Sequence, residues 1–187
     1  MTHLIHQHLS SSQLLKQLIL ITLAVHGILA FFTPLTVDEA HYALYGKFLD
    51  WSYFDHPPMV GWLQSIVLMV GEQEWLLRLW PMLSYTLTLL LLHGYTRFLT
   101  QSLISANLAI LLFTIIPITH ALGVGLVPDT LLLPLAIALI WQAQLTLNQP
   151  RIGNWLLIGL LIGLSALSKY TSILLALGLL LVLINSQ

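Results

Sequence analysis

The sequence predicts an all-α integral membrane protein, and three properties of its composition support this fold class. Hydrophobic residues make up 58% of the 187-residue chain, and the mean hydropathy is +0.90. Charged residues make up only 7%, whereas soluble domains carry roughly 25%. A soluble fold of this length could not bury so much apolar surface. We therefore expect residues 1–187 to form a single domain whose solvent is lipid.

The same composition excludes several classes of protein. Disorder requires low hydrophobicity and high net charge, and the formal net charge here is -1. The six Lys and Arg residues are scattered along the chain, so no basic surface for nucleic acid is expected. The sequence contains no cysteine, which rules out disulfides, thiolate metal ligands and a thiol nucleophile.

Apolar stretches of sufficient length predict the membrane spans in order. A hydrocarbon core about 30 Å thick requires about 20 mostly apolar residues. The first span is expected at residues 17–34 and remains uncleaved, because no small-x-small site follows it. His3, His6 and His8 precede it and are expected in a solvated tail. Further spans are expected at residues 75–99, at residues 103–122 with a bend near Pro117, and at residues 128–147.

Two apolar stretches do not have the length of one span. Residues 154–184 would form a helix about 46 Å long, and Lys169 stands near their middle. Two short helices meeting at Ser168, Lys169 and Tyr170 fit better, which makes about six transmembrane helices in total. Residues 59–70 have apolar residues at helical spacing but are too short to span, so they predict a helix in the membrane interface of the first outer loop.

Placing the N-terminus in the cytoplasm puts every acidic residue on the other side of the membrane. Lys and Arg divide three against three, so the positive-inside rule barely decides the orientation. Asp129 and Lys169 reach the acidic side only after further spans have been crossed. We therefore expect the non-cytoplasmic face to be the working surface. Its seven acids are Asp38, Glu39, Asp50, Asp55, Glu72, Glu74 and Asp129.

Asp38 and Glu39 have two interpretations. With Thr36 they form a Thr-x-x-Glu pattern, which is typical of a capping box at a helix start. Alternatively, Asp38 is a general base at the membrane surface. Polar and aromatic residues follow it at helical spacings: His41, Tyr42 and Tyr45.

Asp55 and His56 also have two interpretations. An acid before the Pro57-Pro58 pair is a plausible helix start. Functionally, the pair offers one oxygen and one nitrogen ligand to a divalent metal ion, or one cation to a phosphate. Two ligands from one turn are not a complete metal site.

Asp129 and Lys169 are ordinary residues when each is taken alone. An acid after Pro128 suits a helix start, and a lysine near a membrane edge can extend to the interface. Broken helices at a membrane edge, however, often line a cavity. All of these ionisable residues are expected on one face, and that favours a shared site.

Four motifs in this order resemble the GT-C glycosyltransferases that use polyprenyl-phosphate sugars. The relatives include protein O-mannosyltransferases, the lipid A aminoarabinose transferase and the RgtABCD-like enzymes. Family members are usually much longer, so the chain resembles an N-terminal portion of their helical bundle. The motifs are Asp38-Glu39-Ala40-His41-Tyr42, Phe54-Asp55-His56-Pro57-Pro58, Val127-Pro128-Asp129 and Gly163-Leu164-Ser165-Ala166-Leu167-Ser168-Lys169-Tyr170.

The resemblance implies roles for four candidate residues. Asp38 would be the catalytic base, Asp55 an acidic neighbour linked to a metal ion, His56 a residue near the lipid phosphate, and Asp129 an acid that supports the site.

The chemistry of the reaction adds further candidates. Glu39 stands beside Asp38 as the second expected catalytic residue, and His56 beside Asp55 as a weak second metal ligand. Cations would stabilise a leaving phosphate. The expected substrate- and phosphate-binding residues are therefore His56, Arg78, Lys169, Asp129 and Tyr42.

The resemblance also implies a function and a location. The chain would belong to an enzyme of the bacterial cytoplasmic (inner) membrane with its active face outward. Its partners would be a polyprenyl-phosphate sugar, membrane lipids and a glycan, lipid or protein acceptor. The alternatives are an inactive fragment or scaffold of such an enzyme, and a transporter or flippase-like protein. A transporter usually shows an internal repeat of spans, and the sequence contains none.

Overall fold

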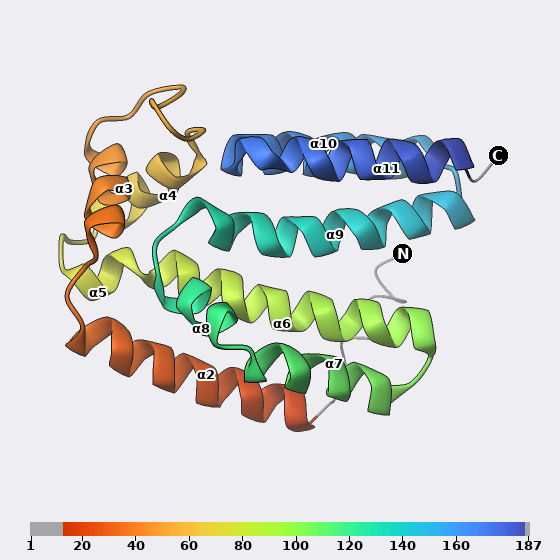
Figure 1. Ribbon diagram of the computed structural model, residues 1–187, viewed down its shortest axis with the longest axis horizontal. Coiled ribbons are helices and arrows are strands. Elements are labelled where there is room, and N and C mark those ends of the chain that lie inside the picture. Colours follow the sequence, from red (N-terminus) through yellow and green to blue (C-terminus); the bar gives the residue numbers. More distant parts are fainter. Residues whose placement is uncertain (1–12, 186–187) are drawn as a thin grey trace.

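The computed structural model describes residues 13–185, and all regular elements within this range are helical (Figure 1). The predicted all-α fold class is therefore confirmed, while His3, His6 and His8 lie outside the described residues. The elements are α2 Gln13–Phe32, α3 Val37–Lys47, α4 Met59–Leu68, α5 Glu74–Leu77, α6 Leu79–Thr100, α7 Leu103–Ile115, α8 Pro117–Val124, α9 Pro128–Asn148, α10 Ile152–Ser168, η1 Tyr170–Ser172 and α11 Ile173–Asn185.

Within residues 13–185, three segments are long and apolar enough to cross a membrane: α2, the continuous stretch Glu74–Thr100, and α9. The count rises to four if the bent pair α7 and α8 is one span. This is fewer than the six transmembrane helices expected from the sequence. The difference lies in α10 and α11, which were expected to be short and have 17 and 13 residues. At 1.5 Å per residue, α10 is about 25 Å long and α11 about 20 Å.

The predicted bend near Pro117 is confirmed. α7 ends at Ile115, α8 begins with Pro117, and their axes differ by 76°. Proline has no N–H and its ring displaces the preceding turn, so a helix that meets a proline breaks before it.

The predicted break at Lys169 is confirmed as well. α10 ends at Ser168, Lys169 has extended backbone angles, and a single 3₁₀ turn leads into α11. Figure 1 shows that α11 runs back toward the end of the bundle at which α10 begins. The last apolar stretch is thus a helical hairpin.

All of the acidic residues lie in segments at one end of the bundle. Figure 1 shows α3, α4 and α5 gathered there, next to the start of α9 and the end of α10. We call this region the acidic end. Residues 48–58 connect α3 to α4 at the same end, so the segments carrying all seven acids share it.

A hydrophobic cluster joins α3 and α4 to the long helices at the acidic end. Tyr42 and Tyr45 of α3 pack with residues of α4, α5 and the start of α9. This core holds two short helices against the bundle, where they can present polar side chains. Its buried members are Tyr42, Tyr45, Val60, Val67, Leu76, Leu77, Leu126 and Leu131.

The arrangement predicts that Asp50 and Gln149 face opposite sides of the membrane, because they lie at opposite ends of the bundle. The natural chain contains no cysteine, so single Asp50→Cys and Gln149→Cys variants can be labelled without background. With an impermeant thiol reagent on intact and opened vesicles, we expect the two variants to label from opposite sides. Labelling of both from the same side would contradict this topology.

Candidate functional site

A buried ion pair between Glu39 and Arg78 forms the structural centre of the acidic end. Arg78 donates from Nε to Glu39 Oε1 at 2.7 Å and from Nη2 to Glu39 Oε2 at 2.8 Å. Both side chains are only 3% exposed. A two-pronged contact of this kind fixes the guanidinium relative to the carboxylate.

The rest of the guanidinium group holds the end of α2. Arg78 Nη1 donates to the carbonyl oxygens of Ala30 and Thr33 and to Thr33 Oγ1, at 3.2, 2.8 and 2.8 Å. Its Nη2 donates to the Pro34 carbonyl at 2.9 Å. Carbonyl groups at a helix C-terminus lack partners within the helix, and a buried cation is stabilised only when such partners surround it. Arg78 is therefore not free to bind phosphate in this structure, contrary to the sequence-based expectation.

Glu39 links three segments through its two oxygens. The Thr36 N–H donates to Glu39 Oε2 at 2.9 Å, and the Glu39 N–H donates to Thr36 Oγ1, so the predicted capping box is present. The Leu126 N–H also donates to Glu39 Oε1, at 3.2 Å. Burial acts to raise the pKa of Glu39, but the hydrogen bonds from Arg78, Thr36 and Leu126 outweigh it and hold the pKa below its ordinary value. This environment suits a permanently charged structural group, rather than the catalytic role expected of Glu39.

Asp38 lies next to Glu39 in sequence but points away from the ion pair. It is exposed, and it makes no side-chain hydrogen bond or ion pair with any other residue within 13–185. Successive residues of a helix point about 100° apart, so one of the two acids can face the core while the other faces outward. Asp38 is thus a carboxylate held at a fixed position on α3 with its oxygens available.

Asp55 is held in place by two residues of α3. Tyr45 donates its hydroxyl hydrogen to Asp55 Oδ1, and His41 Nε2 lies 3.6 Å from Asp55 Oδ2. Burial acts to raise the pKa of Asp55. The hydrogen bond from the Tyr45 hydroxyl and the nearby His56 and His41 act in the opposite direction and outweigh burial, so the pKa of Asp55 is lowered. Tyr53 stacks on Tyr45 and donates to its carbonyl oxygen at 2.8 Å, which fixes the loop that carries Asp55.

His56 lies beside Asp55 and against α3. Its Nε2 is 3.9 Å from Asp55 Oδ2, and its ring centre is 5.3 Å from that of Tyr42. Its Nδ1 is buried and has no hydrogen-bond partner among the described residues. A buried ring nitrogen without a partner is costly, and a bound group with a matching polar atom would remove that cost.

Asp129 and Lys169 form an ion pair where α9 begins and α10 ends. Lys169 Nζ lies 2.6 Å from both carboxylate oxygens of Asp129. Ser168 Oγ donates to the Pro128 carbonyl at 2.9 Å, which brings the two helix ends together. Tyr170, which follows Lys169, has its hydroxyl oxygen 3.0 Å from Ser52 Oγ. The break after α10 is thereby tied to the loop that carries Asp55 and His56.

Tyr42 is the residue around which the carboxylates gather. It is 8% exposed, and burial is the main reason why its pKa is raised. The charges of Asp55, Asp38 and Asp129 each raise it further. The helix of Tyr42 itself, the loop after it and the distant start of α9 thus bring their acids within electrostatic range of one phenol.

The expected metal site does not form from the residues present. Asp55 and His56 are adjacent, but the described part of the chain contains no group of three or more His, Cys, Asp or Glu side chains that could hold a metal ion. Zinc sites use at least three protein ligands, so Asp55 and His56 alone do not form one.

An apolar groove runs from the acidic end into the membrane-spanning part. It has a volume of about 480 Å³ and lies between α4, α6, α9 and α10. Met59 and Trp80 line it at the acidic end, and both pack against the hydrophobic cluster that contains Tyr42. Leu91 and Ala138 line its deeper part. We call it the outer groove.

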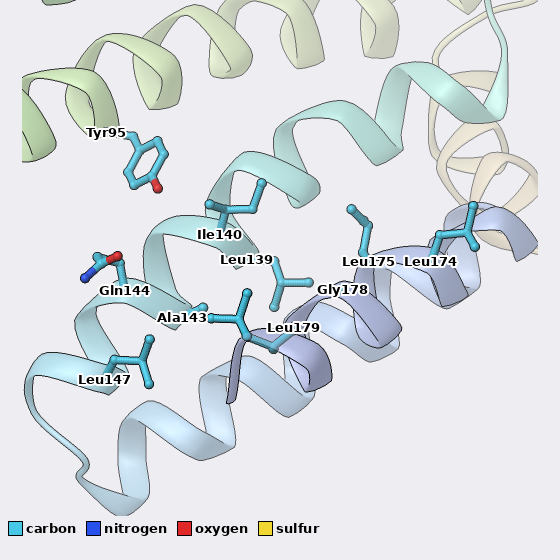
Figure 2. Close-up of a pocket in the computed structure, with 11 residues that line it drawn as sticks. Tyr95, Leu139, Ile140, Ala143, Gln144, Leu147, Leu174, Leu175, Gly178 and Leu179 are labelled. Carbon is cyan, nitrogen blue, oxygen red and sulfur yellow. The ribbon is translucent and has the colours of Figure 1, made fainter. Parts of the chain in front are cut away.

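A second cavity of about 380 Å³ lies between α9 and α11 (Figure 2). Tyr95 of α6 and Gln144 of α9 are its polar lining residues, and the others are aliphatic side chains and Gly178. None of the described residues that line this cavity is charged.

Sequence analysis did not identify several residues of the site. Tyr53 and Ser52 had no recognisable pattern, although both hold the loop in place. Leu126 acts through its backbone N–H, and Thr33 acts through its carbonyl as well as its hydroxyl; sequence does not distinguish backbone contacts of this kind. The aromatic spacing on α3 was the one available signal, since it had marked Tyr45.

The fold and the site together define a class of protein: a helical membrane protein with acids and cations at one end and an apolar groove leading to them. Residues 55–187 match the sequence model of the dolichyl-phosphate-mannose-protein mannosyltransferase family, and the chain belongs to this family. It is also 30% identical, over 142 residues, to the lipid A galacturonosyltransferase RgtD of Rhizobium johnstonii. That match covers 74% of the chain and 29% of the length of RgtD. No solved structure matches the chain.

The buried ion pair generates a prediction about stability. Arg78→Met would leave Glu39 buried without its cation, so we expect a loss of about 3–5 kcal/mol in the free energy of unfolding. Because the pKa of Glu39 is lowered, its contribution is complete above its ordinary pKa of 4.5 and is lost as the pH falls below that value. Denaturant unfolding in detergent at several pH values measures both effects.

The matched control is Lys47→Met, which removes an exposed ion pair with Glu72 at 3.0 Å. Exposed pairs contribute up to about 1 kcal/mol, so this variant should unfold nearly as the natural protein does. Equal losses for Arg78→Met and Lys47→Met would contradict a central role for the buried pair.

Proposed function

We propose that the chain forms the membrane part of a glycosyltransferase that moves a sugar from a polyprenyl-phosphate donor to a hydroxyl acceptor. The acidic end would be the site of transfer and would face the non-cytoplasmic side of a bacterial inner membrane. One observation carries the proposal. Asp38 is exposed, has no partner within residues 13–185, and lies in electrostatic range of Tyr42, while the outer groove begins against the hydrophobic cluster that contains Tyr42. The RgtD match and the family membership support the reaction class.

The chemistry requires a base and a stabilised leaving phosphate. Breaking the bond between sugar and phosphate builds positive charge on the anomeric carbon and negative charge on the phosphate. A carboxylate is a weak base, but it suffices when the acceptor hydroxyl gives up its proton late, after the carbon has become strongly electrophilic. Asp38 fits this role because no neighbouring cation occupies its oxygens.

Of the side chains expected to bind the phosphate, Lys169 and His56 remain. The side chain of Lys169 is 23% exposed and is paired with Asp129. An arriving phosphate would therefore share the Lys169 ammonium group with the Asp129 carboxylate or take the place of that carboxylate. His56 lies across Tyr42 and carries the buried nitrogen that lacks a partner. Positioned donors stabilise developing charge more strongly than mobile ones. Arg78 would act indirectly, by fixing the helix that carries Asp38.

The polyprenyl chain would occupy the outer groove. Its walls are almost entirely aliphatic and aromatic, and they run from α4 to Ala138 on α9. From Leu131 to Ala138 the groove descends along about 10 Å of helix. Burial of hydrocarbon there would hold the phosphate at the acidic end, beside His56.

The first test is Asp38→Asn. Asparagine keeps the size and helix-start preference of aspartate but cannot accept the proton. We expect sugar transfer to fall by about 10²–10⁴-fold with donor binding unchanged. The assay measures transfer of radiolabelled sugar from a polyprenyl-phosphate donor in membranes that contain the complete protein.

Asp50→Asn is the matched control, because Asp50 is an exposed acid of the same end that lies outside the cluster around Tyr42. It should transfer sugar at the natural rate. Normal turnover by Asp38→Asn, with equal expression, would assign Asp38 to the helix start alone.

The second test fills the outer groove. Ala138→Phe would place a ring in the deep part of the groove, so we expect weaker use of long polyprenyl donors and little change with short-chain donors. Ala143→Phe fills the second cavity instead and serves as the control. Equal effects of the two variants on the ratio of long to short donor use would contradict a chain-binding role for the outer groove.

A further inference from the structure

The break between α7 and α8 leaves backbone carbonyl groups without helical partners. Pro117 has no N–H, and the chain bends by 76° at this point. Unpaired carbonyls are costly in an apolar environment, so non-helical backbone at membrane depth needs partners within the protein. Two side chains of α8 supply them. Thr119 Oγ1 donates to the Phe113 carbonyl at 2.9 Å, and His120 Nε2 donates to the Thr114 carbonyl at 2.7 Å.

The contact with Thr114 determines the direction of a second hydrogen bond. A carbonyl oxygen only accepts, so Nε2 of His120 carries the hydrogen. In a neutral imidazole the other nitrogen is then an acceptor. His26 Nε2 lies 2.9 Å from His120 Nδ1, and must therefore be the donor of that bond. The chain of bonds runs from His26 on α2, through His120 on α8, to the end of α7.

His26 is tightly enclosed at this position. It is 1% exposed, and its ring lies edge-on to Tyr85 of α6, with 4.7 Å between centres. Gly123 permits the close approach of α8, because a Cβ there would lie 2.3 Å from His26 Cε1 and 2.8 Å from Tyr85 Cδ2. Three helices thus meet at one imidazole.

The segment that follows α8 leads directly into the candidate site. The Leu126 N–H donates to Glu39, and Thr130 Oγ1 donates to the carbonyls of Leu122 and Gly125. Asp129 lies between these contacts. The position of α8 therefore determines where this segment meets Glu39 and where α9 begins.

We propose that His26 and His120 are a positioning pair, which locks the broken span against α2 and thereby holds the segment after α8 on Glu39. Its consequence for catalysis, through Asp129, rests on the proposed function. The effect of the pair on the order of the backbone between residues 122 and 131 is independent of that function.

Hydrogen exchange of peptides covering residues 122–131, measured by mass spectrometry on the protein in nanodiscs, tests the pair. We expect His26→Leu and His120→Leu to exchange about tenfold faster there, since both lose the hydrogen bond between the two rings and His120→Leu also loses the bond to the Thr114 carbonyl. His26→Gln keeps an N–H donor at the end of the side chain and should restore slow exchange. The matched control is His93→Leu. His93 is buried like His26, with 0% against 1% exposed, but it lies on α6, away from the break between α7 and α8.

Unchanged exchange in both His26→Leu and His120→Leu would overturn the proposal, and so would an equal acceleration in His93→Leu. If the leucine variants do not fold, His26→Asn replaces them, because its side chain is too short to reach His120. Equal exchange in His26→Asn and His26→Gln would then overturn it. Asp38→Asn should leave exchange unchanged, so failure of sugar transfer and failure of the positioning pair are separate results.

Discussion

The ion pair between Glu39 and Arg78 is the interaction on which the acidic end depends. Two opposite charges are buried together, so each must be fully surrounded by partners. Those partners come from the end of α2, the start of α3 and the segment before α9. The need to satisfy one guanidinium and one carboxylate thus brings three separate segments to fixed positions, and the candidate site is built on their outer side.

Around this centre some charged residues hold the structure, and others remain available to bind a substrate. Glu39 and Arg78 are enclosed, whereas Asp38, which precedes Glu39 on the same helix, is exposed. Asp129 and Lys169 are intermediate, because they are paired but partly open to solvent. A site for a charged substrate needs both kinds. The enclosed pair keeps α3 rigid, and the open groups can exchange a protein partner for a substrate group.

The two helix breaks contribute to the site in different ways. The break at Pro117 is repaired by side chains of α8, so the polypeptide can bend inside the bundle and return to the acidic end at Leu126. The break at Lys169 places a partly exposed lysine, paired with Asp129, where two short helices meet. Both bends bring backbone or side chains from distant segments to one surface, and continuous spanning helices would carry those residues past it.

The sequence by itself determined the features that depend on composition or on neighbours a few residues apart. These are the membrane fold class, the bend at Pro117, the break at Lys169 and the capping box from Thr36 to Glu39, since each follows from local sterics or hydropathy. Only the tertiary structure decided which acid of the Asp38-Glu39 pair is buried and that Arg78 is its partner. The contacts responsible join Glu39 to Arg78 and to Leu126, which lie 39 and 87 positions further along the chain. Such pairings depend on how the helices pack, and no local pattern in one sequence specifies them.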